Sequence, residues 1–281
     1  TPETVLTIPY ALKRSVKVFH DHEPHPTQRL TTAGVLAVSS NTGSIKIGEM
    51  LSNDTLYDYL TKFGIGSKTG SGLPGESRGI LPKVADWSGT TAPTVAFGQG
   101  YSLTAMQATS VFATIANDGV RVSPTVIAGT SDSSGNYTPS ATRESVRVIS
   151  ADTAGKMRLM MESVVSANGT APSAAIPGYR VAGKTGTAQR IDDTCGCYRG
   201  YTASFIGFAP ADNPAYVISV TIQDPKGLHW GGYLGGPVFK KVMSFVLQSK
   251  GIAPTGTKII PIALTEKQLI AAKEASSVKT N

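Results

Sequence analysis

The sequence predicts an α+β fold. Three segments with the composition of strands follow one another in the second half of the chain, at about residues 178–187, 201–208 and 215–223. Segments with the 3.6-residue apolar period of helices precede and follow them. Because only a short loop separates the first two strand segments, we expect them to pair as a hairpin.

The chain before these strands is predicted to be mainly helical, after an extended and loop-rich entry over residues 1–26. Four prolines interrupt every periodic pattern in that entry. Ser52 and Ser150 are placed as N-caps of two of the helices that follow. The predicted helices lie at about residues 27–38, 42–51, 53–63, 104–117 and 151–166.

Loops and one more helix complete the expected organisation. Residues 64–101 are rich in glycine and proline, and residues 64–75 are predicted to be loop throughout. Pro237 is expected to open a helix, because apolar residues follow it at helical spacing. Residues 251–281 become polar and are interpreted as a tail, with a short helical tendency at 265–275.

Composition excludes several classes of protein. The 281 residues are 40% hydrophobic and 16% charged, as in an ordinary globular protein. The net charge of +7 is spread out and no run of Lys or Arg marks a nucleic-acid surface, although an anionic polymer or a membrane surface is a permitted partner. No apolar stretch approaches the roughly 20 residues that span a bilayer. Since the sequence starts at Thr1 without Met, we interpret it as a piece of a longer protein or a mature product.

The only two cysteines, Cys195 and Cys197, flank a glycine. Two thiols alone cannot form a structural zinc site, so the choice lies between a tight local disulfide and free thiols. An extracytoplasmic location would favour the disulfide.

Three of the four histidines lie close together near the start of the chain, at His20, His22 and His25. Imidazole and carboxylate groups suit zinc, and Asp21 and Glu23 lie between these histidines. The residues lack a regular spacing on a helix, so a polar surface loop is the preferred interpretation and we predict no metal site.

The segment Val181–Ala188 contains Lys184-Thr185-Gly186 followed by Thr187, and it is the centre of the functional interpretation. In a hairpin, this strand exposes an ammonium group, a hydroxyl group and a residue without a side chain. Such a strand can pair with an extended peptide while Lys184 and Thr185 hold an anionic end. A side chain at Gly186 would push the backbone of the ligand away.

Three similar motifs are rejected because their surroundings do not fit the chemistry. A second Lys-Thr-Gly at 68–70 lies in a loop, where no strand presents it. Residues 178–185 match the phosphate-binding pattern of NTPases, but no helix follows Lys184-Thr185. Residues 75–79 match Gly-x-Ser-x-Gly without the buried strand that a nucleophile elbow requires.

A second motif, Ser39-Ser40-Asn41, lies between two predicted helices. Its position offers a hydroxyl and an amide at a fixed point that faces a cleft. The pattern Ser-x-Asn is weak by itself, because residues 134–136 and 166–168 also match it in loops. Only the place between helices distinguishes the first match.

The combination resembles the transpeptidase domain of class B penicillin-binding proteins. The resemblance covers roughly residues 1–250 as the C-terminal part of such a domain, with 251–281 as a polar C-terminal tail. It implies a mostly antiparallel sheet flanked by helices, with a helical subdomain across a cleft. Cys195-Gly196-Cys197 looks like an actinobacterial insertion. The further stretches that look like division-specific members are Ser39-Ser40-Asn41-Thr42-Gly43, Leu73-Pro74-Gly75-Glu76, Gly98-Gln99-Gly100 and Ala116-Asn117-Asp118-Gly119.

One departure from the family pattern is serious. The family's nucleophilic Ser and its Lys lie in a Ser-x-x-Lys motif that comes before all of these motifs. The only match in this chain is Ser276-Ser277-Val278-Lys279, which follows them all and is rejected. We therefore expect the chain to begin after the nucleophile helix, so that this chain alone is an incomplete enzyme.

The resemblance implies a role for each matching residue. Ser39 relays protons beside the family's lysine, and Asn41 holds the amide of the substrate. Lys184 supplies positive potential and Thr185 binds the substrate carboxylate. The backbone N–H of Thr187 forms half of the oxyanion hole.

The implied function is a serine-type D-Ala-D-Ala transpeptidase that cross-links peptidoglycan during septum formation and is acylated by β-lactams. The implied partners are stem peptides, β-lactams, the upstream Ser-x-x-Lys segment and membrane proteins of the division machinery, with no cofactor. The implied location is the extracytoplasmic face of the bacterial membrane, through an N-terminal anchor. The alternatives are an inactive cell-wall-binding or scaffold homologue, and a D,D-carboxypeptidase or serine β-lactamase of the same fold.

Overall fold

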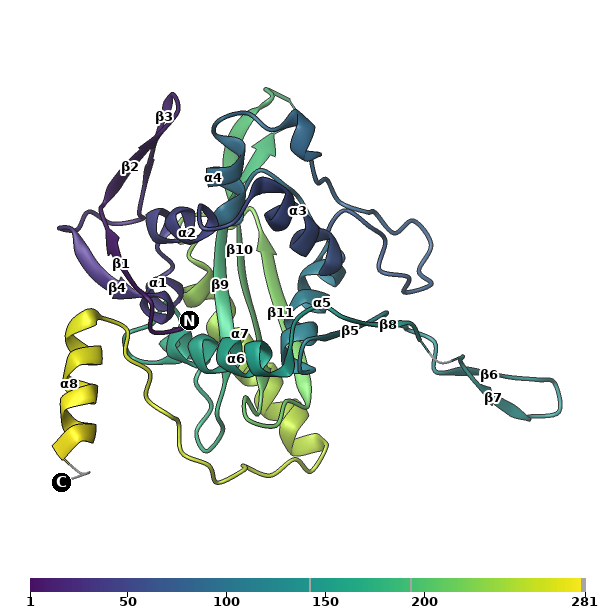
Figure 1. The fold of residues 1–281 in the computed structure, drawn as a ribbon. Coiled ribbons are helices and arrows are strands. Elements are labelled where there is room, and N and C mark those ends of the chain that lie inside the picture. The colour runs from purple at the N-terminus through teal and green to yellow at the C-terminus, as the bar shows by residue number, and fades with distance from the viewer. Residues whose placement is uncertain (142, 193, 279–281) are drawn as a thin grey trace.

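The computed structural model describes residues 1–141, 143–192 and 194–278, and its centre is a three-stranded sheet (Figure 1). The strands are β9 (Ala182–Asp192), β10 (Cys197–Ala209) and β11 (Tyr216–Gln223). Their order is β11-β10-β9 and both pairings are antiparallel. The strands lie where the sequence predicted them, with β9 displaced toward the C-terminus.

The two faces of the sheet bury different sets of side chains. Phe205 faces α7 (Gly231–Ser249) and packs against Phe239 with ring centroids 4.9 Å apart. Phe208, three residues further along β10, packs with Ile115 and Met161 from the helices on the opposite face. This alternation follows from the two-residue period of a strand, and it places Lys184 and Thr185 on opposite faces of β9.

The helices on the second face begin at well-defined caps. These helices are α1 (Thr32–Val38), α5 (Ala105–Ala116) and α6 (Ala151–Val165). Thr104 forms a capping box with Gln107 at the start of α5. Ser150 accepts a hydrogen bond from the Thr153 N–H at the start of α6, as predicted.

The N-terminal prediction was wrong in one respect. The helix expected from residue 27 begins at Thr32, because Thr31 is its N-cap and accepts a hydrogen bond from the Gly34 N–H. The residues before it form β4 (Gln28–Thr31), which pairs with β1 (Val5–Ile8). Leu30 lies opposite Leu6 in this pairing and both are buried, so sheet formation overrides the helical period. A hairpin of β2 (Ala11–Arg14) and β3 (Lys17–His20) completes the entry segment.

The remaining elements surround this centre. A narrow arm of two small hairpin-like sheets projects away from the body (Figure 1). Ser52 caps α3 as predicted. The elements are α2 (Asn41–Gly48), α3 (Asn53–Lys62), η1 (Val84–Asp86), α4 (Thr91–Ala96), β5 (Val120–Val122), β6 (Gly129–Ser131), β7 (Tyr137–Pro139), β8 (Ser145–Arg147), η2 (Pro172–Ala174) and α8 (Glu266–Val278).

The closing helix α7 begins at Gly231, six residues before the predicted start at Pro237. Its first turns are glycine-rich, and the sequence pattern assigned them to a loop. A Cβ atom on Gly231 would overlap the carbonyl oxygens of Ser204 and Gly186. The glycines therefore allow the helix to lie directly against the sheet beside the Lys-Thr-Gly strand.

The segment after α7, expected as a polar tail, is tied to the rest of the chain. The Thr31 N–H donates to the Leu264 carbonyl over 3.0 Å, and Tyr179 Oη donates to the Ile252 carbonyl over 2.6 Å. Arg29 makes two hydrogen bonds to the carboxylate of Glu266 at the start of α8. In the part of the chain that the structure describes, no helix has the length and apolar character to cross a membrane.

Candidate active site

Lys184 on β9 and Ser39 at the end of α1 meet across 145 residues of sequence. The Lys184 ammonium donates a 2.6 Å hydrogen bond to Ser39 Oγ and a 3.0 Å hydrogen bond to the Thr185 carbonyl. Ser39 adopts a left-handed conformation (φ 57°, ψ 45°) as the C-cap of α1. This sharp turn brings its hydroxyl to the ammonium group.

The surroundings of Lys184 favour the neutral amine. Burial lowers its pKa to about 8, because taking the ammonium out of water disfavours the charged form. No carboxylate of the described residues forms an ion pair with it to offset this effect. The group is therefore mostly charged at pH 7 and loses its charge as the pH rises through about 8.

Thr185 and Thr187 point to the opposite face of β9, toward the start of α7. Thr185 Oγ1 lies 2.8 Å from Thr170 Oγ1, and Thr187 Oγ1 accepts a 3.2 Å hydrogen bond from the Gly231 N–H. Gly186 lies between them, opposite Ser204 of β10. The two threonines thus connect the strand to its neighbours on the α7 side.

Among the strands that the structure describes, β9 pairs only with β10 and is the edge of the sheet. An edge strand presents unpaired N–H and C=O groups with the spacing that an extended peptide requires. Lys184, Gly186 and Thr187 all lie on this edge strand. The arrangement can bind a peptide along β9 and hold its anionic end at Lys184.

Asn41 is the first residue of α2 and faces the N-terminal segment. Its Nδ2 donates a 2.9 Å hydrogen bond to the His20 carbonyl. Ser40 is buried and caps α2 by accepting a hydrogen bond from the Gly43 N–H. The three residues of the motif therefore do different things: Ser39 meets Lys184, Ser40 caps the helix, and Asn41 is anchored through its amide nitrogen.

Asp21 fixes this turn, and sequence reasoning missed that role. Its buried carboxylate accepts hydrogen bonds from Ser40 Oγ at 2.6 Å and from the Thr42 N–H at 2.8 Å. Thr42 Oγ1 donates to the same carboxylate over 3.3 Å. The partners lie 19 and 21 residues away, so no local pattern points to them. The sequence signal was limited to an acidic residue among histidines and prolines.

His25 completes the network behind the turn. Its Nε2 lies 2.9 Å from Asp21 Oδ2, and its Nδ1 lies 2.7 Å from the Pro26 carbonyl. Burial opposes protonation of the ring, but the hydrogen bonds to Pro26 and Asp21 outweigh it and raise the pKa of His25.

The alternative interpretation of the histidines as metal ligands does not fit these contacts. His22 contacts the ring of Trp230 at a centroid distance of 3.9 Å, whereas His20 lies beside Tyr10. The described residues include no group of three His, Cys, Asp or Glu side chains with a geometry that could hold a metal ion.

The rejected motifs lie where the sequence placed them. Thr69 of the second Lys-Thr-Gly is buried in a loop and bonded to Glu76. Ser77 is exposed in the same loop region. The strand β9 continues through Lys184-Thr185, which excludes a phosphate-binding loop there. The match at 276–279 begins in α8, and its Lys279 lies outside the described residues.

The choice left open for the two cysteines is decided by the structure. Cys195 and Cys197 form a disulfide at the tip of the β9–β10 hairpin, with Cα atoms 5.2 Å apart.

Comparison with known proteins identifies the family. A family model described as the penicillin-binding protein transpeptidase domain matches residues 1–244. Penicillin-binding protein PbpB of Mycobacterium tuberculosis is 39% identical over 262 residues, which cover 90% of this chain and 39% of that protein. The peptidoglycan D,D-transpeptidase FtsI of Escherichia coli is 35% identical over 252 residues, which cover 88% of this chain and 40% of that protein. The chain thus spans about two fifths of the length of these relatives.

Solved structures agree with this result and confirm the expected fold. Penicillin-binding protein 3 from Mycobacterium tuberculosis, complexed with ampicillin, has a TM-score of 0.89 at 38% identity. The match covers 94% of this chain and 61% of that one. The transpeptidase domain of penicillin-binding protein 3 from Burkholderia pseudomallei has a TM-score of 0.80 at 31% identity, with 92% and 75% covered. The chain therefore belongs to the penicillin-binding protein transpeptidase domain family.

Proposed function

We propose that this chain is the C-terminal part of a peptidoglycan D,D-transpeptidase that cross-links the cell wall during septum formation. The observation that carries the proposal is the 2.6 Å hydrogen bond between Lys184 and Ser39, which joins the two motifs at the edge of the sheet. FtsI of Escherichia coli carries the name peptidoglycan D,D-transpeptidase, and PenA of Neisseria flavescens carries the name probable peptidoglycan D,D-transpeptidase. Two structural neighbours are complexes with ampicillin and aztreonam. These names support a site that accepts D-Ala-D-Ala peptides and their β-lactam mimics.

The reaction is an acyl transfer through a serine in a Ser-x-x-Lys segment upstream of this chain. The serine hydroxyl attacks the carbonyl carbon of the penultimate D-Ala of a stem peptide. The C–N bond to the terminal D-Ala breaks, and that residue takes up a proton and leaves as an amine. An amine of a second stem peptide then attacks the ester, loses its proton and returns the hydroxyl group to serine.

Lys184 and Thr185 hold the anionic end of the substrate in this proposal. The ammonium of Lys184 is partly removed from water, so its attraction to a carboxylate is stronger than that of an exposed lysine. Ser39 accepts a hydrogen bond from that ammonium. Its hydroxyl can relay a proton beside the lysine of the upstream Ser-x-x-Lys segment.

The other three residues position the peptide. The side-chain N–H of Asn41 donates a hydrogen bond to the His20 carbonyl. This arrangement leaves the side-chain oxygen of Asn41 to accept a hydrogen bond from the N–H of a substrate amide. Gly186 lets the peptide backbone approach the edge of β9. The Thr187 N–H supplies one donor of an oxyanion hole, and the N–H of the upstream serine supplies the other.

The proposed location is the extracytoplasmic face of the cell membrane, through an N-terminal anchor outside this chain. The Cys195–Cys197 disulfide supports that location, since disulfides persist in oxidising compartments. Membrane proteins of the division machinery are the proposed protein partners.

Intact-mass spectrometry of the full-length protein that contains this chain tests the proposal. Incubation with a penicillin should add one antibiotic mass, on a peptide from the upstream segment. Lys184→Ala should slow the acylation by about a hundredfold, the typical loss for a group that stabilises the transition state. Lys68→Ala is the matched control, because Lys68 belongs to the second Lys-Thr-Gly and should leave the rate unchanged.

The outcomes separate the proposal from its alternatives. A full-length protein that gains no mass would be an inactive binding or scaffold homologue. An adduct that is hydrolysed within minutes would indicate a β-lactamase, whereas a persistent adduct supports the transpeptidase. Release of D-Ala without cross-linked product, in the presence of an acceptor amine, would indicate a carboxypeptidase.

A further inference from the structure

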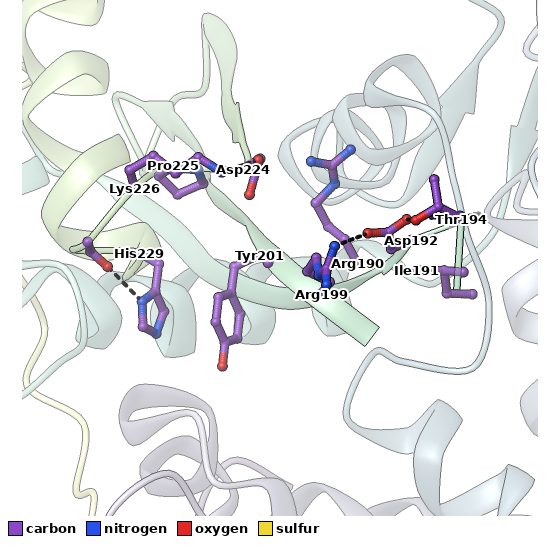
Figure 2. Close-up of a pocket in the computed structure, with 12 residues that line it drawn as sticks. Arg190, Ile191, Asp192, Thr194, Arg199, Tyr201, Asp224, Pro225, Lys226 and His229 are labelled. Atoms are coloured by element: carbon purple, nitrogen blue, oxygen red, sulfur yellow. Dashed lines mark hydrogen bonds and ion pairs between the residues drawn. The ribbon is translucent and has the colours of Figure 1, made fainter. Parts of the chain in front are cut away.

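A cavity of about 590 Å³ lies at the far end of β9, beyond the Lys-Thr-Gly motif. It is lined by the ends of β9 and β10 and by the segment that follows β11 (Figure 2). Its first lining residue, Arg190, is six positions beyond Lys184. At about 3.4 Å per residue, the cavity therefore begins roughly 20 Å along the same strand edge.

The cationic side chains that line this cavity differ in whether they form ion pairs. The described lining residues include three cations, of which two are already paired. Arg199 lies 3.3 Å from Asp192, and Lys226 lies 2.6 Å from Asp224. The third cation, Arg190, makes no ion pair with any described residue. It is the one guanidinium in this cavity that is not already occupied by a carboxylate among the described residues.

Arg190 lies within electrostatic reach of both acidic residues. Figure 2 shows its guanidinium between the side chains of Asp192 and Asp224. Hydrogen bonds from Thr194 chiefly, then one from Arg199 and the charge of Arg190, hold the pKa of Asp192 below its usual range. Lys226 chiefly, with a contribution from Arg190, does the same for the pKa of Asp224. Both carboxylates are therefore ionised at neutral pH, and the three cations among the described lining residues leave an excess of one positive charge.

Two of the lining residues, Tyr201 and His229, are aromatic. Tyr201 stacks on His229 with ring centroids 4.1 Å apart and planes 6° from parallel. His229 in turn lies 4.3 Å from Trp230, the residue before α7. Because Tyr201 is paired with Gln189, these rings lie on the face of the sheet opposite the Arg190 side chain, and Figure 2 shows them pointing away from its guanidinium.

The direction of the substrate leads from the motif to this cavity. A peptide whose C-terminal carboxylate is held at Lys184 and Thr185 must extend along β9 one way or the other. The start of the strand is closed, because Ala182 and Gly183 are buried in the domain core. The open direction runs past Thr187 toward Arg190, which is the course of an antiparallel pairing with β9.

We propose that the cavity around Arg190 is a subsite for an acidic group of the substrate peptide, on a residue that precedes its C-terminal pair. The inference rests on the proposed function and adds a requirement for substrate chemistry. Arg190 binds the carboxylate through the two parallel hydrogen bonds that a guanidinium can donate.

The spacing limits where the acidic group can lie. Arg190 lies five positions beyond Thr185, which corresponds to about 17 Å of extended chain. On the fifth residue from the C-terminus, a carboxylate close to the main chain is near enough to reach the cavity. A longer acidic side chain reaches it from the third or fourth residue.

Binding of matched peptides to the full-length protein tests the subsite. The peptides end in D-Ala-D-Ala and carry one carboxylate at the third, fourth or fifth residue from the C-terminus, each paired with its amide analogue. At one of these positions we expect the acid to bind about tenfold more tightly than the amide, the usual effect of one charge-assisted contact. Isothermal titration calorimetry measures both affinities.

Variants assign the effect to the cavity. Arg190→Gln should reduce the affinity for the acidic peptide to that for the amide, and Arg190→Lys should give an intermediate value because it keeps the charge and loses the paired geometry. Arg78→Gln is the matched control, since Arg78 is an exposed arginine in a different loop. It should leave the preference for the acid intact.

The outcomes distinguish a failure of this inference from a failure of the proposed function. If peptides ending in D-Ala-D-Ala bind, and Lys184→Ala weakens them, but acid and amide bind equally, only the subsite is overturned. Equal losses in Arg190→Gln and Arg78→Gln also overturn it, as does an acidic peptide that binds equally well without D-Ala-D-Ala. If no D-Ala-D-Ala peptide binds, the proposed function fails and the subsite with it.

Discussion

At the scale of single residues, Lys184 combines a charge with a partly dehydrated position. Because burial lowers its pKa to about 8, the amine is mostly charged at pH 7 and mostly neutral at pH 9. We expect the affinity for a D-Ala-D-Ala carboxylate to fall as the pH rises through 8. Calorimetry from about pH 6.5 to about pH 9.5 measures this change. Lys184→Arg keeps its charge over the interval, so the same decline in that variant would contradict the assignment to Lys184.

The same shift has a consequence for stability, and its sign can be worked out. Between pH 8 and the pKa of a lysine in the unfolded chain, about 10.4, the unfolded state binds one more proton than the folded state. The free energy of unfolding should therefore rise with pH in this interval. Below pH 8 the penalty for burying the ammonium is fully present.

Asp21 is the second residue whose chemistry decides the geometry of the site. In Asp21→Asn, an amide nitrogen replaces a carboxylate oxygen that accepts from Ser40 and His25, so a donor faces a donor. We expect a loss of about 3 kcal/mol in the free energy of unfolding, as for a broken buried pair. Urea denaturation measures it.

The pH dependence of that variant separates its charge from its packing. The raised pKa of His25 stabilises the folded wild type fully below the unfolded pKa of histidine, about 6.5, and this contribution is lost as the pH rises through the folded pKa. In Asp21→Asn this dependence should shrink, because only the hydrogen bond to the Pro26 carbonyl is left. An unchanged pH profile would show that Asp21 does not interact with a charged His25.

Residue chemistry was only partly predictable from the sequence. Ser39, Asn41 and Lys184 are found by a motif resemblance, because each stands in a short pattern with a fixed local structure. Asp21 has no such pattern, since its hydrogen bonds depend on two segments that come together only in the folded chain. The pairing of His25 with Asp21 is local, over four residues, but it follows no regular helical spacing in this proline-rich segment.

At the scale of elements, the site depends on how closely α7 approaches β9. A Cβ on Gly231 would overlap two backbone carbonyl oxygens, which cannot move without displacing the strands or the helix. A Cβ on Gly186 would meet only the hydroxyl of Ser204, at 2.5 Å, and that side chain can rotate away. We expect Gly231→Ala to cost about 2–3 kcal/mol and Gly186→Ala less than about 1 kcal/mol.

Thermal unfolding of the two variants checks this difference in packing. Ser204→Ala combined with Gly186→Ala should recover most of the smaller loss, since it removes the only close atom. Equal destabilisation by Gly231→Ala and Gly186→Ala would contradict the idea that the helix–strand contact, rather than glycine content, is what matters.

The sequence predicts elements well where composition and period agree. The helices α5 and α6 follow their apolar period, and α6 begins at the predicted cap, Ser150. The prediction was wrong at β4, where partners from β1 stabilise a strand that has a helical period. It also misplaced the start of α7, because glycines that serve close packing look like loop residues in the sequence.

At the scale of the whole molecule, the C-terminal segment connects distant parts of the chain. The carbonyls of Leu264 and Ala263 accept hydrogen bonds from Thr31, more than 230 residues earlier. Contacts over such a separation leave no pattern in the local sequence, which is why residues 251–281 looked like a tail. Leu264 of this segment packs against Ala33 and Ala37 of α1, the helix that ends at Ser39. The segment therefore helps to hold α1, and with it Ser39, in place.

Gly34 in α1 is the point where this support can be tested. A Cβ atom at this position would overlap the Leu264 carbonyl oxygen, whose bond to Thr31 fixes the segment. Gly34→Ala should therefore displace the segment, lower the free energy of unfolding by about 2 kcal/mol and expose residues 252–264 to proteases. Gly155→Ala in α6 is the matched control, because only Arg158 Nη2 approaches its Cβ, at 3.9 Å.

In an open helical position, alanine is favoured over glycine by roughly 1 kcal/mol, so Gly155→Ala should stabilise the protein. If Gly34→Ala lowers the free energy of unfolding and Gly155→Ala raises it, the loss at Gly34 comes from contact with the C-terminal segment and not from helix propensity. If Gly34→Ala also stabilises the protein, the segment does not lie against α1 in solution. The support for Ser39 would then have to come from α2 and Asp21 alone.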